Sequence, residues 1–181
     1  MVIEFDKLIK WLFSGVPIPL SENSVFLTDS LIMITLLRTT PGNAGYKEMV
    51  AKLDAELKIT DGEDHAFYDQ FNKSDQIKHA IVLFEGEMPI GCGALKEFHK
   101  EVMEIKRMFI LKEKRGKGYA SQILNELEVW AKELGFKTCI LETGINQPEA
   151  IALYKKRGYH FIPNYGQYAG IEKSFCFKKD I

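Results

Sequence analysis

A glycine-bearing turn between an apolar run and a periodic helix constrains the fold of this 181-residue chain more than any other feature. The turn is Arg115-Gly-Lys-Gly-Tyr-Ala120, between a strand-like run at 104–111 and a helix expected over 119–134. Glycines let the backbone approach a phosphate, and the free N–H groups of a helix N-terminus attract anions. We therefore predict an anion site here. Alternatively, the glycines serve only the geometry of a strand-to-helix turn.

Two common phosphate-binding motifs are absent from the sequence. It contains no Gly-x-x-x-x-Gly-Lys-Ser/Thr and no Gly-x-Gly-x-x-Gly with an acidic residue about 20 positions later. Nucleoside triphosphate and dinucleotide folds are therefore disfavoured. The charge around the turn still suits a small polyphosphate ligand, through Lys112, Lys114, Arg115 and Lys117.

Composition and charge are those of a globular domain. Hydrophobic residues make up 46% and charged residues 27% of the chain, and its length suffices for one domain with a full core. A net charge of -1 argues against a nucleic-acid partner, which usually requires a basic face. No apolar run reaches the roughly 18 residues of a spanning helix, so we expect no membrane partner.

Cysteine and histidine usage predicts neither disulfides nor a metal site. The three cysteines are widely spaced, without a Cys-x-x-Cys pair, and are expected to be reduced, structural thiols of a cytoplasmic protein. The four histidines lack metal-ligand spacing. The cysteines are Cys92, Cys139 and Cys176.

Apolar periodicity divides the chain into an N-terminal extension, residues 1–30, and a single domain, residues 31–181. The extension is expected to hold a short amphipathic helix over 2–13, followed by a loop. This helix would pack on the domain or on a partner subunit, so a homodimer is one possible assembly.

Within the domain we predict an α/β (α+β) fold with a mixed, mostly antiparallel sheet, helices on both faces and one parallel strand–helix–strand crossover. Glycines at 135 and 158 should end two helices, and Asn146 with Glu149 should cap the last one. Strands are expected over 31–38, 80–84, 89–98, 102–111, 138–142, 159–162 and 174–178. Helices are expected over 46–57, 65–72, 119–134 and 146–157.

This order of elements resembles the GNAT superfamily of acyl-CoA-dependent N-acetyltransferases. The segment 104–110 and the Arg-x-x-Gly-x-Ala turn support the resemblance. So does 147–159, which is similar to the family's Asn-x-x-Ala-x-x-Leu-Tyr-x-x-x-Gly-Phe/Tyr segment. The resemblance covers residue 31 to the C-terminus and implies a GNAT-like fold. Gln147 stands where the family often has Asn, and the adjacent Asn146 is either its substitute or a helix cap.

The resemblance implies acetyl-CoA as the acyl donor, without a metal. The backbone of Met108, Phe109 and Ile110 would bind its pantetheine arm as though it were an added strand. Asn146 and Gln147 are further cofactor-binding candidates. The diphosphate would be held by the amides of Arg115, Gly116, Lys117, Gly118, Tyr119 and Ala120.

The implied chemistry is direct attack of an amine on the thioester in a ternary complex. An alkylamine has a pKa near ~10 and arrives protonated, so a general base is required. Glu104 resembles the strand glutamate that serves as base in some family members, and Tyr154 is the candidate general acid. Alternatively, Glu104 is a solvated strand residue and Tyr154 a packing tyrosine.

The acceptor site is expected from two loops, 61–72 and 163–170. Their aromatic residues would frame a small amine, and Asp64 or Asp69 would pair with its charge. Alternatively, both loops are surface connections with core-anchoring aromatics. The aromatic candidates are Phe67, Tyr68, Tyr165 and Tyr168.

These inferences predict a cytoplasmic N-acetyltransferase that acts on a primary amine of a small molecule or peptide. The alternative is a non-catalytic, regulatory acyl-CoA-binding module that uses the same cleft. The presence of both Glu104 and Tyr154 favours the enzyme.

Overall fold

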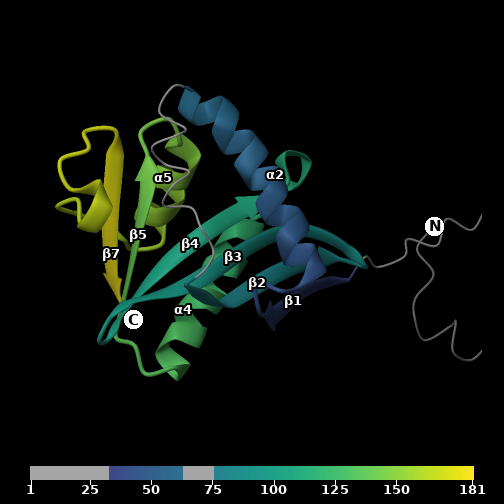
Figure 1. The fold of residues 1–181 in the computed structure, drawn as a ribbon. Helices are drawn as coiled ribbons and strands as arrows, with labels where there is room; N and C mark the ends of the chain where they lie inside the picture. The colour runs from purple at the N-terminus through teal and green to yellow at the C-terminus, as the bar shows by residue number, and fades with distance from the viewer. Residues whose placement is uncertain (1–32, 63–75) are drawn as a thin grey trace, which may run out of the picture. The chain divides into compact units, whose positions relative to one another are not determined.

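The structure, a computed structural model, describes residues 33–62 and 76–181, which belong to one compact unit (Figure 1). The helices expected over 2–13 and 65–72 and the extension at 1–30 lie outside the described residues, so these expectations remain predictions.

The described residues form one seven-stranded sheet in the order β1-β2-β3-β4-β5-β7-β6. Neighbouring strands are antiparallel except for β4 and β5, which are parallel and joined through a helix, as predicted for the crossover. The strands are β1 (Ile34–Thr39), β2 (Ile77–Glu85), β3 (Met88–His99), β4 (Val102–Ile110), β5 (Thr138–Gly144), β6 (His160–Ile162) and β7 (Ser174–Asp180).

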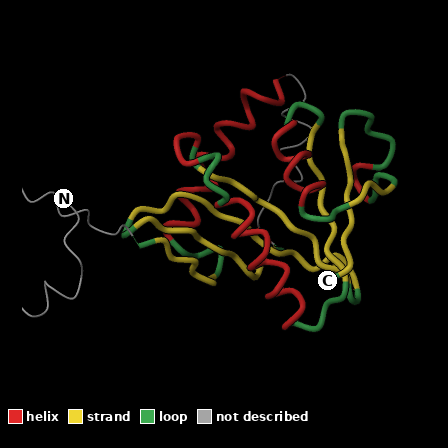
Figure 2. The backbone as a smooth tube through the Cα atoms, turned by 180° about the vertical axis from the view of Figure 1, so that it is seen from behind, coloured by secondary structure: helices red, strands yellow, loops and turns green. Residues whose placement is uncertain are grey.

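Helices cover both faces of the sheet. Figure 1 shows α2 (Ala44–Asp61) in front of the central strands and α4 (Tyr119–Glu133) behind them, and Figure 2 shows the reverse. The helix α5 (Pro148–Lys156) follows β5, and two short 3-10 turns, η2 (Lys112–Lys114) and η3 (Gly166–Tyr168), complete the described elements. The predicted mixed, mostly antiparallel sheet with helices on both faces is confirmed.

The apolar stripe of α4 packs closely on β3 because β3 carries glycines there. Ile123 and Leu127 are fully buried. A Cβ added to Gly93 would lie 2.7 Å from Ile123 Cγ2 and 2.8 Å from Leu127 Cδ1. A Cβ at Gly91 would lie 2.8 Å from the carbonyl oxygen of Phe109. These two positions therefore require glycine for contact between helix and sheet.

Helix ends follow the sequence in two places and depart from it in a third. Gly135 and Gly158 adopt positive φ angles of 89° and 85° just after α4 and α5, as expected for helix stops. The predicted capping pair of Asn146 and Glu149 is wrong. The N-cap of α5 is Gln147, without a side-chain cap, because the Asn146 amide donates instead to the carbonyl oxygen of Thr60 at 3.2 Å.

The parallel pairing of β4 and β5 is short, and the two strands separate where the candidate site lies. The two strands are in register only from Val102 to Glu104. Beyond that point β5 stays paired with β7, while β4 continues beside β3 through a bulge at which Arg107 has a φ of 57°. Among the described strands none pairs with β4 on its β5 side after Glu104, so this backbone edge is open.

Candidate active site

The glycine turn has the backbone geometry of an anion site. Gly116 and Gly118 have positive φ angles of 79° and 82°, and α4 begins directly afterwards without a side-chain cap. A Cβ at either glycine would meet no atom within 4 Å, so the space beside the turn is open. The predicted contact of the Arg115 amide is corrected, because this amide already donates to the carbonyl oxygen of Lys112 at 3.3 Å. The amides from Gly116 to Ala120 donate no hydrogen bond to a described residue. They are therefore available to a diphosphate.

The side-chain charges of the turn are less available than the sequence indicated. Lys114 is partly buried and forms an ion pair with Glu85, and Arg115 forms one with Glu56 at 2.6 Å. Lys112 and Lys117 are exposed, and neither forms an ion pair with a described residue. Of the four cations, only these two therefore have no carboxylate partner among the described residues.

The end of β4 provides a partly open edge. Phe109 and Ile110 pair with Cys92 and Gly91 of β3 on one side. The carbonyl oxygen of Ile110 accepts a hydrogen bond from Arg115 Nε at 3.0 Å, so this oxygen is already occupied. Between Glu104 and Ile110, the edge of β4 that does not pair with β3 faces the gap toward β5, where an extended ligand has room.

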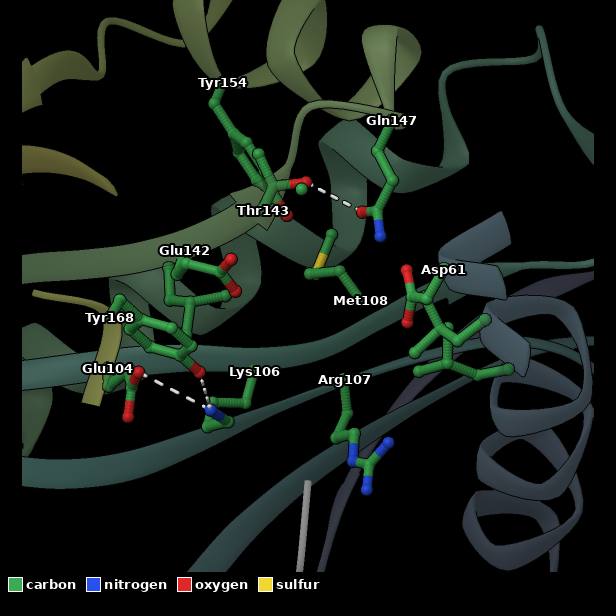
Figure 3. A pocket seen from close by; sticks show the side chains of 14 residues that line it. Asp61, Glu104, Lys106, Arg107, Met108, Glu142, Thr143, Gln147, Tyr154 and Tyr168 are labelled. Atoms are coloured by element: carbon green, nitrogen blue, oxygen red, sulfur yellow. Dashed lines mark hydrogen bonds and ion pairs between the residues drawn. The ribbon is translucent and has the colours of Figure 1, made fainter. Parts of the chain in front are cut away.

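A pocket of about 100 Å³ lies where β4 and β5 separate. Figure 3 shows side chains entering it from both strands, from α2 and from α5. Its polar lining includes three carboxylates and two cations, of which Arg107 is held by Asp54 at 2.5 Å. The polar and aromatic side chains that line the pocket are Asp61, Glu104, Lys106, Arg107, Glu142, Thr143, Gln147, Tyr154 and Tyr168.

The predicted base Glu104 lines the pocket but is already engaged by its neighbours. Its side chain is 2% exposed, so the alternative of a solvated strand residue is wrong. The Tyr165 hydroxyl donates to Glu104 Oε1 at 3.1 Å, and Lys106 Nζ lies 3.5 Å from the same oxygen.

The predicted acid Tyr154 is buried and lines the same pocket. Its ring packs against Tyr159 and Phe177, with centroid distances of 5.8 and 5.9 Å. Burial, and to a smaller extent the nearby Glu142, raises the pKa of the Tyr154 phenol above its ordinary value of 10. Its hydroxyl makes no hydrogen bond to a described residue. The phenol therefore keeps its proton at neutral pH.

Of the four aromatic acceptor candidates, the structure describes two. Tyr168 lines the pocket, and its hydroxyl accepts a hydrogen bond from Lys106 Nζ at 3.2 Å. Tyr165 packs on Tyr168 with centroids 5.9 Å apart and reaches the site through Glu104. Phe67 and Tyr68, with the aspartates at 64 and 69, lie outside the described residues.

Gln147 lines the pocket beside α5, and its Oε1 accepts a hydrogen bond from the Thr143 hydroxyl at 2.7 Å. Asn146 is exposed and tied to the end of α2. Of these two predicted cofactor contacts, the structure therefore supports a position at the pocket only for Gln147.

Sequence reasoning missed Glu142 of β5, which lines the pocket. Burial raises the pKa of its carboxyl from 4.5 to about 7, with Glu104 and Asp61 adding to the rise and Ser174 and Lys106 opposing it. Its Oε1 is buried and has no hydrogen-bond partner among the described residues. No sequence motif marks this glutamate, since its position depends on the separation of β4 from β5.

The cysteines are buried and unpaired, as predicted. Burial raises the pKa of Cys92 and Cys139 to about 12 and that of Cys176 to about 11, so all three remain thiols at neutral pH. In the described part of the chain, no cluster of His, Cys, Asp or Glu is placed to hold a metal ion. No helix within residues 33–62 and 76–181 has the length and apolar character needed to cross a bilayer.

Comparison with known proteins connects this fold and site to acyl transfer. An Escherichia coli (strain K12) protein, the uncharacterized N-acetyltransferase YjgM, is 31% identical over 133 residues, which cover 68% of this chain and 80% of that protein. An IAA acetyltransferase of Azospirillum brasilense is 27% identical over 151 residues, 82% of this chain and 98% of that protein.

Solved structures agree with these sequence relatives. A protein from Klebsiella pneumoniae subsp. pneumoniae MGH 78578, provisionally assigned as an acyl-CoA N-acyltransferase, superposes with a TM-score of 0.69 at 27% identity, over 82% of this chain and 98% of that one. A GNAT family acetyltransferase from Elizabethkingia anophelis, solved with acetyl-CoA bound, shares the fold with a TM-score of 0.60 at 19% identity, over 82% and 98% of the two chains.

The fold and these relatives thus place the chain among the acyltransferases that use an acyl-CoA donor. More narrowly, residues 47–159 match the pattern of the Acetyltransferase (GNAT) family, and the chain belongs to that family. The resemblance inferred from the three sequence segments is confirmed.

Proposed function

We propose that this chain transfers an acetyl group from acetyl-CoA to a primary amine of a small molecule or peptide. The observation that supports the proposal best is the path of β4, which leads from the acidic pocket at Glu104 to the free amides of Gly116–Ala120. A diphosphate at the turn and a reactive group at the pocket would then lie at the two ends of one open strand edge. A protein of the same fold that was solved with acetyl-CoA bound adds support.

In this proposal the glycine turn binds the diphosphate of acetyl-CoA, and acyl transfer takes place in the pocket. When bound, acetyl-CoA supplies an acyl group activated as a thioester. The amides of 116–120 hold the diphosphate, and exposed Lys112 and Lys117 add charge. The open backbone of β4 orients the pantetheine arm. Tyr154 holds a proton at its hydroxyl for the departing sulfur.

The charge of the pocket favours an acceptor that arrives as a cation. Three carboxylates, those of Asp61, Glu104 and Glu142, line a space in which Lys106 is already bonded to Tyr168. A primary ammonium group would neutralise part of this negative charge on binding. The reaction also requires that the ammonium lose a proton, and Glu104 and Glu142 are the pocket carboxylates that β4 and β5 provide.

The test is release of thiol from acetyl-CoA by the full-length chain across a panel of alkylamines, amino acids and short peptides. Calorimetry with acetyl-CoA runs in parallel. Turnover with at least one amine supports the proposal. Tight acetyl-CoA binding without turnover on any amine would favour the regulatory module instead, and the absence of both binding and turnover would contradict the two readings together.

The possible homodimer stays a separate prediction, because residues 2–13 lie outside the described residues. Deletion of these residues should lower the mass measured by light scattering if they join two subunits. An unchanged mass would exclude that role.

A further inference from the structure

The two glutamates of the pocket differ in what surrounds their oxygens. Glu104 Oε1 accepts a hydrogen bond from Tyr165 and lies 3.5 Å from Lys106 Nζ. Glu142 Oε1 is buried without a hydrogen-bond partner among the described residues, although its side chain accepts a hydrogen bond from Ser174. A buried carboxylate oxygen without a donor is costly, so it gains most from a proton or from a donor that a ligand brings.

The position of Glu142 suits contact with a ligand. In Figure 3 its carboxylate points from β5 toward the middle of the pocket, with Tyr154 above it and Tyr168 below. Tyr154 is the candidate that would protonate the leaving sulfur. An acceptor nitrogen in the middle of the pocket would therefore have the Glu142 oxygen on the side of the proposed acid.

The groups around Glu142 leave its charge largely uncompensated. Among the described residues, the cation that lowers its pKa is Lys106, which is shared with Tyr168 and Glu104. The balance of burial and neighbours raises the pKa of Glu142 to about 7, so near neutral pH both forms are populated. The titratable and charged groups that face Glu142 are Lys106 and Glu104 from β4, Asp61 from α2, Tyr154 from α5, Tyr168 from η3 and Cys176 from β7.

We infer that Glu142, and not Glu104, is the catalytic base that removes a proton from the acceptor's ammonium group, an inference that rests on the proposed acetyl transfer. The ammonium N–H bond breaks, its electron pair stays on nitrogen, and the proton passes to Glu142 Oε1. The neutral amine forms the C–N bond, and the C–S bond breaks with its pair on sulfur. Tyr154 gives its proton to the sulfur, the nitrogen's second proton restores the Tyr154 hydroxyl, and the Glu142 proton leaves to water.

Glu104 takes a different role in this arrangement. Its contacts with Tyr165 and Lys106 connect β4 to the segment that holds Tyr168. It is therefore a positioning residue, whose loss should loosen the pocket wall and raise the KM for the amine. Loss of the Glu142 carboxylate should instead lower kcat and remove the rise of kcat/KM with pH near pH 7.

The experiment compares Glu142→Gln, Glu142→Asp and Glu104→Gln with exposed Glu87→Gln as matched control, in full-length protein with an amine that the wild type acetylates. We expect Glu142→Gln to lower kcat/KM at pH 7 by about 10²–10³-fold, a typical loss for a general base. It should also abolish the rise of kcat/KM through about pH 7, whereas Glu142→Asp and Glu104→Gln should retain a rise. Glu87→Gln should match the wild type.

A second readout does not depend on turnover. Carbon NMR of protein labelled at the glutamate carboxyls should show a signal that titrates near pH 7 and is missing in Glu142→Gln. Calorimetry should show unchanged acetyl-CoA affinity in that variant, which also reports that it folds.

The inference is overturned if Glu142→Gln keeps more than about a tenth of wild-type kcat/KM. It is also overturned if the pH profile of kcat/KM for this variant still has an inflection near pH 7. It is also overturned if the Glu142 signal titrates near 4.5, the ordinary value. A wild type that binds acetyl-CoA but turns over no amine defeats the proposed function itself and removes the role of Glu142 with it. The two failures are thus distinguishable, because only the first occurs in an active enzyme.

Discussion

The guanidinium of Arg115 contacts both carboxylate oxygens of Glu56, at 2.6 and 2.8 Å, and so joins the glycine turn to α2. Its Nε also donates to the carbonyl oxygen of Ile110, and the guanidinium lies 5.7 Å from the centre of the Phe109 ring. Arg115 therefore holds the turn against the rest of the domain. In the proposed reaction, recognition of the diphosphate rests mainly on backbone amides, which makes the glycines the natural targets for a test.

Substitution of Gly118 by Ala should weaken acetyl-CoA binding. Gly118 has a φ of 82°, a conformation that costs an alanine about 1–2 kcal/mol, and relief of that strain would turn the amides away from the ligand. We expect the Kd measured by calorimetry to rise at least about tenfold, which corresponds to about 1.4 kcal/mol.

Gly135→Ala is the matched control for that substitution. Gly135 has a φ of 89° and lies just after the other end of α4, with no atom within 4 Å of an added Cβ. It should lower the free energy of unfolding by a similar amount without changing the Kd. Equal affinity losses in both variants would contradict an anion site at the turn.

Removal of the Tyr154 hydroxyl should slow the reaction while leaving the fold intact. Tyr154→Phe keeps the ring contacts with Tyr159 and Phe177 but removes the proton proposed for the leaving sulfur. We expect kcat to fall by about 10²-fold or more, with little change in acetyl-CoA affinity. Tyr159→Phe, in the same cluster but outside the pocket lining, should keep wild-type kcat. Full activity of Tyr154→Phe would leave this tyrosine a packing residue.

The raised pKa of Glu142 also predicts a pH-dependent stability. The folded-state pKa is about 7 against an ordinary value of 4.5, so the folded protein binds this proton more tightly than the unfolded chain does. The resulting stability is fully present below about pH 4.5 and is lost as the pH rises through about 7. The full difference of these pKa values corresponds to roughly 3 kcal/mol.

Urea unfolding of the wild type and Glu142→Gln at pH 5 and pH 8 measures this loss. Because the glutamine carries no charge at either pH, the stability of the variant relative to the wild type should increase toward pH 8, by up to about 3 kcal/mol. Glu87→Gln, an exposed control, should show no such trend. A pH-independent difference for Glu142→Gln would mean that its carboxyl titrates normally.

Packing between β3 and α4 should not tolerate a methyl group at Gly93. The added Cβ would lie within 3.0 Å of Ile123, Leu127 and Met108 atoms, at 2.7, 2.8 and 2.9 Å. Overpacking of this kind typically costs about 1–3 kcal/mol in the free energy of unfolding. At Gly42, where the nearest atom would be 3.5 Å away, the same substitution should cost much less. Similar melting temperatures for the two variants would contradict the observed contact.

Local sequence patterns were sufficient to predict most described elements of this fold. The stripe of α4, the glycines after α4 and α5, and the parallel crossover all follow from residues within one element or its ends. The cap of α5 was not predictable in this way. Asn146 bonds to Thr60, which is 86 residues away, so a contact between α2 and the turn before α5 replaced the local interaction.

The sequence by itself determined the strand–turn–helix unit with its free amides, because glycine conformation and helix-end donors are local properties. Only the tertiary structure decided which carboxylates meet in the pocket and which cations stay exposed. Glu142 becomes buried beside Glu104 because β5 leaves β4 after Ile140, and Arg115 is engaged because α2 brings Glu56 to it. Burial and charge pairing depend on segments distant in the chain, and these set the chemistry of each group.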